Sequence, residues 1–217
     1  MADNFFAKMM EDAWNTRVNW FRAFNRQAAP GGTVLVGDSL TNEFPIHELL
    51  ALRKDERLFH VHNRGIGGDT TDGVLRRMAE SIWDLKPAKL FLLIGTNDLA
   101  NADASPDGIA ENIRAILSQT KTQCPQTMCT VLSLYPVNPR TEEGMDVLTV
   151  GCRTNERIRA VNRALAGVAQ ETETAYLDMH SLLADERGNL RRAYTREGLH
   201  LTPEGYRVVL EALLPLL

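Results

Sequence analysis

Short apolar runs alternate along the chain with segments whose apolar residues recur every three or four positions. Five of these runs predict β-strands, at residues 33–36, 58–61, 89–95, 130–134 and 175–177. Near-continuous apolar strands are typical of a parallel sheet that is covered on both faces. The intervening periodic segments predict helices. This alternation predicts an α/β protein, a three-layer α/β/α sandwich around a five-stranded parallel sheet.

The N-terminal segment shows a helical pattern of apolar residues. Residues 3–27 predict an amphipathic helix, in which apolar side chains recur at helical spacing: Phe6, Met10, Ala13, Trp14, Val18, Phe21 and Phe24. We expect this helix to pack on the sandwich as a cover for its core, within a single domain of residues 1–217. A helix lying on a membrane surface is the alternative, which the mixed charge of the polar side disfavours.

Composition and charge disfavour several classes of function. The net charge is −4 with no block of Lys or Arg, so no nucleic-acid partner is expected. No apolar run approaches the ~20 residues of a membrane helix, and the first residues lack the pattern of a secretory signal. The three cysteines are Cys124, Cys129 and Cys152, an odd count that favours a reducing compartment over a disulfide framework. We therefore expect a cytoplasmic protein without stable membrane insertion.

The candidate chemistry lies directly after the predicted strands. Ser39 follows the first strand, Gly68 the second and Asn97 the third. The carboxyl ends of parallel strands meet at one edge of an open sheet, where ligands bind. Ser39 is a candidate nucleophile once a base takes its proton. The backbone N–H groups of Ser39 and Gly68 and the side-chain amide of Asn97 would form a three-donor oxyanion hole.

A candidate base comes from far along the chain. His200 lies three residues after Glu197, with Gly198 between them for a tight turn. That spacing lets the carboxylate reach imidazole Nδ1 and leaves Nε2 for Ser39. The other histidines lack supporting patterns: His60 and His62 alternate on a predicted strand without further ligand residues, so no metal site is expected.

Together these segments resemble the SGNH hydrolases, the GDSL family of esterases and lipases. Four positions match the residues that name the family: Ser39, Gly68, Asn97 and His200. The segments 65–71 and 199–206 are most similar to the branch that contains the catalytic subunits of intracellular platelet-activating-factor acetylhydrolase and its bacterial relatives. The resemblance implies a flavodoxin-like sandwich, an acyl-enzyme mechanism and no cofactor. Relatives often form dimers, so a homodimer is one candidate assembly.

One position departs from the family pattern, which has Asp three residues before the histidine. Here the position is Glu197, whose side chain is one bond longer; we expect it to serve as the acid, with Asp178 and Asp185 as alternatives. Further substrate-binding candidates lie next to the nucleophile and at the start of the long irregular segment 135–151: Asp38, Leu40, Tyr135 and Val137. We expect that segment to influence alcohol specificity.

The sequence thus predicts a serine esterase with a small-molecule ester substrate, acting on short acyl groups, most simply acetyl esters of a carbohydrate or lipid alcohol. A thioesterase or lysophospholipase-type acyl hydrolase uses the same machinery and is the first alternative. A metal-dependent phosphoesterase would need convergent His and carboxylate ligands, which the pattern lacks. A non-catalytic interaction protein with a relic site is the remaining alternative.

Overall fold

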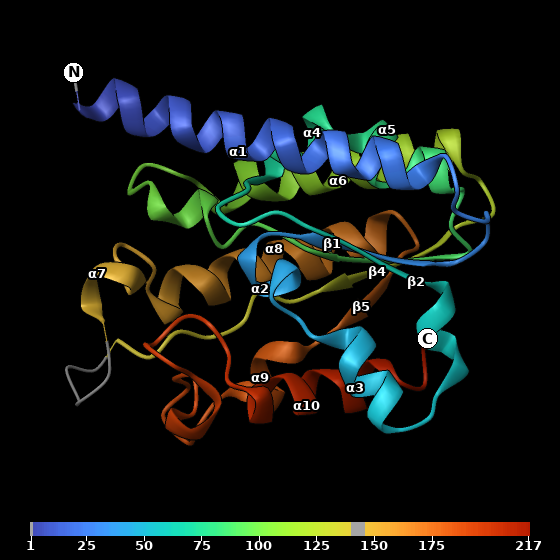
Figure 1. Ribbon diagram of the computed structural model, residues 1–217. Helices are drawn as coiled ribbons and strands as arrows, with labels where there is room; N and C mark the ends of the chain where they lie inside the picture. Colours follow the sequence, from blue (N-terminus) through green and yellow to red (C-terminus); the bar gives the residue numbers. More distant parts are fainter. Residues whose placement is uncertain (1, 140–145) are drawn as a thin grey trace.

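The computed structural model describes residues 2–139 and 146–217 (Figure 1). Five parallel strands form one sheet in the order β2-β1-β3-β4-β5, which confirms the predicted fold class. The strands are β1 (Thr33–Gly37), β2 (Val61–Gly65), β3 (Lys89–Leu93), β4 (Met128–Leu132) and β5 (Ala175–Leu177).

Helices cover both faces of this sheet (Figure 1). One layer contains α1 (Ala2–Asn25), α4 (Thr71–Arg76), α5 (Met78–Ser81), α6 (Pro106–Gln123) and α8 (Asn155–Glu171). The other contains α3 (Ile46–Leu52), α9 (Met179–Leu183) and α10 (Pro203–Leu213). Shorter elements are α2 (Ser39–Asn42), α7 (Val147–Val150) and the 3₁₀ turns η1 (Glu56–His60), η2 (Trp83–Leu85), η3 (Asp98–Ala100) and η4 (Arg192–Tyr194).

The strand order determines where a ligand can enter. The chain leaves β1 toward one helical layer and leaves β3 toward the other, so a crevice opens between the carboxyl ends of these two neighbours. Gly37 pairs in register with Gly65 on one side and with Leu93 on the other. The three strands therefore end level, and the loops that follow them reach the same edge of the sheet.

Three predicted strands differ from the structure by two residues or more. The strand predicted at 89–95 ends at Leu93 in β3. Residues 58–60 belong to η1, and β2 begins only at Val61. Because β2 is an edge strand, His62 and Asn63 are half-buried and polar, which hides the strand from a search for apolar runs. The predicted strand at 130–134 is shifted as well, since β4 spans Met128–Leu132.

The N-terminal helix covers the core only in part. The α1 side chains of Val18 and Phe21 are buried, as predicted. Met10 and Phe24, which share the predicted apolar spacing, are exposed, so for them the expectation of core packing is wrong. The helix extends past the sheet at its N-terminal end (Figure 1). No helix within the described ranges combines the length and the apolar character needed to cross a bilayer.

Candidate active site

Ser39 lies at the first position of the short helix α2, directly after β1. Asp38 caps this helix by accepting a hydrogen bond from the Leu40 amide at 2.9 Å. Gly37 is required here, because a Cβ would overlap both the Thr41 hydroxyl and the Leu93 carbonyl. The turn is therefore compact, and it presents the partly exposed Ser39 side chain at the carboxyl edge of the sheet.

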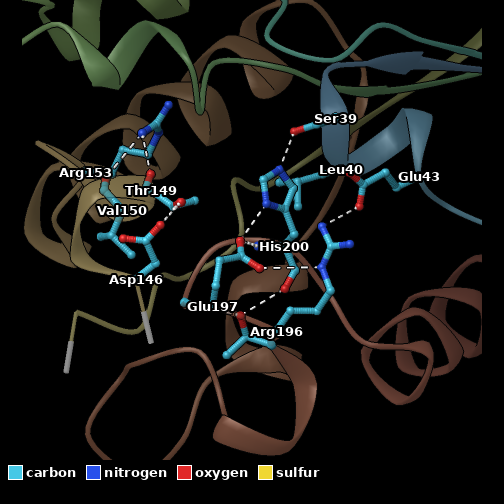
Figure 2. A network of polar contacts seen from close by, with 12 residues as sticks. Ser39, Leu40, Glu43, Asp146, Thr149, Val150, Arg153, Arg196, Glu197 and His200 are labelled. Atoms are coloured by element: carbon cyan, nitrogen blue, oxygen red, sulfur yellow. Dashed lines mark hydrogen bonds and ion pairs between the residues drawn. The ribbon is translucent and has the colours of Figure 1, made fainter. Parts of the chain in front are cut away.

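His200 approaches Ser39 from a tight turn near the C-terminus (Figure 2). Its Nε2 lies 2.9 Å from Ser39 Oγ. The turn is closed by Thr195, whose hydroxyl donates to the His200 carbonyl at 2.9 Å and accepts from the Gly198 amide at 2.8 Å. Gly198 has a φ of +110°, a conformation that favours glycine. The structure therefore brings the side chains of Ser39 and His200 together.

Glu197 reaches the other side of the imidazole. One of its carboxylate oxygens, Oε1, lies 2.6 Å from His200 Nδ1 and accepts the His200 backbone N–H at 2.8 Å. An acceptor at Nδ1 favours the tautomer that carries its proton there, and Nε2 is then the nitrogen free to accept a proton from Ser39. Of the other predicted acids, Asp178 caps α9 and Asp185 closes a separate turn, so Glu197 is the carboxylate that contacts His200.

The longer side chain of Glu197 is held in place by an arginine that the sequence analysis missed. Arg196 Nε lies 3.5 Å from Glu197 Oε2, and its terminal nitrogen lies 2.9 Å from Glu43 Oε2 (Figure 2). Glu43 is the residue that ends α2, the helix of Ser39. The guanidinium therefore connects the turn of the base to the helix of the nucleophile, and it restrains a carboxylate whose extra bond would otherwise add freedom.

The loop after β2 places Gly68 at the same edge. Gly68 has a φ of +77°, which is strained for any residue with a Cβ. The next residue, Asp69, is buried and forms an ion pair with the fully buried Arg77 at 2.7 Å. Arg77 also donates to the Gly37 carbonyl at 3.0 Å, which ties the end of β1 to this loop. Thr70 then caps α4.

Asn97 is fixed at both ends of its amide. Its Nδ2 donates to the Asp69 carbonyl at 3.0 Å, and its Oδ1 accepts from the Arg153 guanidinium at 2.8 Å. Arg153 also donates from Nε to the Thr96 carbonyl at 2.8 Å. These contacts set which end of the amide is the donor beside Gly68. Arg153 lies just after α7, and no local sequence pattern points to it.

Asp38 carries the most perturbed carboxyl at this edge. The pKa of Asp38 is raised to about 7: burial is the main cause and the charges of Asp69 and Asp98 add to it, while the Leu40 amide and Arg153 act in the opposite direction. One oxygen, Oδ2, is buried without a hydrogen-bond partner among the described residues. Asp38 therefore keeps its proton to a higher pH than an exposed carboxyl does.

The four additional substrate-binding candidates are all buried: Asp38, Leu40, Tyr135 and Val137. Leu40 has a role in the fold, because its carbonyl accepts a hydrogen bond from the Tyr206 hydroxyl at 3.1 Å. Part of the segment 135–151 lies outside the described residues, at 140–145. Among the residues that are described, no group of three or more His, Cys, Asp or Glu side chains converges to hold a metal ion.

The comparisons with known proteins agree with this geometry. The sequence model of the GDSL-like lipase/acylhydrolase family matches residues 35–208. Platelet-activating factor acetylhydrolase IB subunit alpha2 from Homo sapiens is 28% identical over 204 residues, which covers 94% of this chain and 82% of that protein. Subunit alpha1 from Bos taurus is 29% identical over 209 residues, with the same coverage.

Solved structures extend the comparison. A provisionally assigned platelet activating factor from Streptococcus pneumonia superposes with a TM-score of 0.88 at 28% identity and covers 100% of this chain and 98% of its own. Axe2, an acetylxylan esterase from Geobacillus stearothermophilus, shares the fold with a TM-score of 0.68 at 16% identity, over 87% of this chain and 94% of its own. The chain belongs to the GDSL-like lipase/acylhydrolase family and is an ester-hydrolysing enzyme.

Proposed function

We propose that the chain is a serine carboxylic-ester hydrolase that forms an acyl-enzyme on Ser39. The observation that carries the proposal is the unbroken line of contacts from Ser39 Oγ to His200 Nε2 at 2.9 Å and from His200 Nδ1 to Glu197 Oε1 at 2.6 Å. A neutral imidazole in this position accepts the serine proton. The adjacent carboxylate then stabilises the imidazolium that forms.

In the first step Ser39 Oγ attacks the ester carbonyl carbon while its proton moves to His200 Nε2. The carbonyl oxygen gains the negative charge, and the proposed donors to it are the amides of Ser39 and Gly68 and the side chain of Asn97. Each such donor is typically worth ~3–4 kcal/mol of transition-state stabilisation. When the tetrahedral intermediate collapses, the bond to the alcohol breaks and His200 gives its proton to the departing oxygen.

In the second step water replaces the alcohol. His200 takes a proton from the water, whose oxygen attacks the acyl carbon through the same oxyanion site. Collapse of this intermediate breaks the bond to Ser39, returns the proton to Oγ and releases the carboxylic acid. The cycle needs no cofactor, because every proton transfer passes through one imidazole.

We further propose that the acyl group is short, most simply acetyl. A long acyl chain needs an apolar tunnel that leads away from the nucleophile. The space beneath Leu40 and Tyr135 is filled by core side chains, and the cavity there has a volume of only about 10 Å³, far too small for a long acyl chain. The names of two similar proteins, platelet-activating factor acetylhydrolase and acetylxylan esterase, also refer to removal of acetyl groups.

The alcohol is proposed to be a carbohydrate or a lipid alcohol, the two classes that those names represent. The segment around α7 is proposed to influence this choice, because Thr149 and Val150 of α7 contact Arg153 and thus lie near Asn97 (Figure 2). All three cysteines are free, which supports placing the protein in a reducing compartment such as the cytoplasm.

A series of p-nitrophenyl esters of increasing chain length tests the acyl preference. We expect kcat/KM to be highest for the acetate ester and to fall as the chain lengthens; a preference for octanoate or longer esters would contradict the proposal. Acetate release from acetylated xylo-oligosaccharides and from acetylated lipids then separates the two alcohol classes. Faster cleavage of acetyl thioesters than of the matched oxygen esters would favour the thioesterase alternative.

A further inference from the structure

A groove of about 500 Å³ lies beside the edge strand β2, between α1 and the segment that follows α2. Its polar lining contains two arginines and two histidines: Arg17, Arg64, His47 and His62. No Asp or Glu is among the described residues that line it. The groove shares no lining residue with the proposed catalytic group, so it is a separate place on the molecule.

The two guanidinium groups are unusual because they lack acidic partners. Arg64 is 5% exposed, and its terminal nitrogens donate only to the Asn63 carbonyl and the Asn25 side chain. Arg17 donates to the Asn42 side chain at 3.2 Å. Within the described part of the chain neither arginine forms a salt bridge, and the Nε of each is buried without a hydrogen-bond partner. A buried guanidinium of this kind is costly without an anion.

Both positive groups pack against the same aromatic side chain. The Arg17 and Arg64 guanidinium carbons are 5.4 Å and 4.8 Å from the centre of the same Phe21 ring. Burial and the charges of Arg17 and Arg77 lower the pKa of Arg64 to about 10. Burial, Arg64, His47 and His60 all lower the pKa of His62. Every one of these charge effects comes from another base, and no Asp or Glu is among the described residues that line the groove, which favours an anionic ligand.

We propose that this groove binds a phosphate-type oxyanion carried by a small molecule. Guanidinium groups form paired hydrogen bonds to the oxygens of phosphate, and two arginines that line one groove favour a dianion over a singly charged carboxylate. His47 donates from Nε2 to the Val61 carbonyl at 2.8 Å, so its Nδ1 remains for a ligand or a proton.

The groove is larger than a phosphate ion needs. Its volume falls in the range of about 300–1,000 Å³ that is usual for small-molecule sites. Apolar side chains of Phe24, Phe44 and Val61 line it together with the bases. An organic phosphate with a small apolar group would use both parts, the bases for the oxyanion and the apolar wall for its substituent.

Isothermal titration of the full chain in phosphate-free buffer at physiological ionic strength tests the assignment, with inorganic phosphate, phenyl phosphate and benzoate as probes. We expect saturable binding of phenyl phosphate at one site, weaker binding of inorganic phosphate, and binding of benzoate at least about ten-fold weaker than that of phenyl phosphate. Titration of His62 by NMR provides a local readout, because an anion beside it should raise its lowered pKa. Absence of saturable phosphate binding, or equal affinity for benzoate, would overturn the proposal.

Two variants locate the site. Arg17→Gln removes one guanidinium from a partly exposed position and should weaken phenyl phosphate binding about ten-fold, the loss expected for one charge-assisted hydrogen bond. Arg22→Gln is the matched control, because Arg22 lies on the same helix and pairs with Glu80 away from the groove. Circular dichroism confirms that both variants fold. Equal binding by the two variants would show a general charge effect and would also overturn the proposal.

Discussion

Arg153 offers the sharpest test of how the proposed oxyanion site is built. Arg153→Met keeps the length and apolar stem of the side chain and removes the donors to Asn97 Oδ1 and to the Thr96 carbonyl, both at 2.8 Å. Asn97 then keeps only its contact with the Asp69 carbonyl at 3.0 Å, so its amide can rotate away from the productive orientation.

The size of the effect follows from these contacts. Complete loss of an oxyanion donor costs about 10²–10³-fold in kcat, which sets the upper limit. A charge-assisted hydrogen bond is worth about 1.5–3 kcal/mol, and only part of this is lost if Asn97 samples its old orientation. We therefore expect kcat to fall by about 10–100-fold, with KM changed by less than about three-fold because the oxyanion exists only in the transition state.

Steady-state hydrolysis of p-nitrophenyl acetate measures both parameters. Arg159→Met is the control, since Arg159 is exposed on α8, close to Arg153 in sequence. A double-mutant cycle with Asn97→Ala tests the pathway: if Arg153 acts by orienting Asn97, the double variant should be no slower than Asn97→Ala alone. Fully additive losses, or a raised KM with unchanged kcat, would refute the reasoning.

Three further predictions concern the carboxylates and the buried ion pair. Glu197→Gln should lower kcat by roughly 10²–10⁴-fold, because the imidazolium of His200 loses its counter-charge. The control Asp178→Asn should leave kcat near its original value. A near-normal kcat in Glu197→Gln would exclude Glu197 as the acid of the catalytic group. The raised pKa of Asp38 means that the folded state keeps a proton that the unfolded state loses, so the free energy of unfolding should fall between about pH 4 and pH 7 and level off above. Urea unfolding of Asp38→Asn should lack this contribution. An identical pH dependence in both proteins would contradict the prediction. Arg77→Met should lower the free energy of unfolding by about 3–5 kcal/mol, because the Asp69 carboxylate is left buried without its ion-pair partner. In the control Arg76→Met, loss of the exposed Arg76–Glu11 pair should cost less than about 1 kcal/mol. Similar losses in the two variants would contradict the large contribution assigned to the buried pair.

Much of this fold can be predicted from the sequence, because the apolar runs along the chain coincide with the strands that are buried in the sheet. Buried strands such as β1 and β3 are continuous apolar runs, and the residues that follow them must reach one edge of a parallel sheet. The edge strand β2 lacks such a run, since it contains half-buried polar residues such as His62, and the sequence therefore places it incorrectly. Met10 and Phe24 share the apolar spacing of α1 and are nevertheless exposed, because the spacing does not record which of these side chains find a partner in the rest of the protein.

The contacts that the sequence did not reveal are those between distant segments. Arg153 and Asn97 are far apart along the chain, and so are Arg196 and Glu43. Each arginine stands in a loop without periodicity, so no spacing rule connects it to its partner. By contrast, the predicted contact of Glu197 with His200 depends on a three-residue turn, which local geometry alone can suggest.

The central claim is that Ser39 carries the acyl group. Intact-mass spectrometry of the protein treated with a fluorophosphonate ester, followed by peptide mapping, measures this directly. We expect one covalent adduct, located on Ser39, together with complete loss of ester hydrolysis, and no adduct in Ser39→Ala. An unmodified Ser39 in folded, active protein, or ester hydrolysis that persists in Ser39→Ala, would contradict the account.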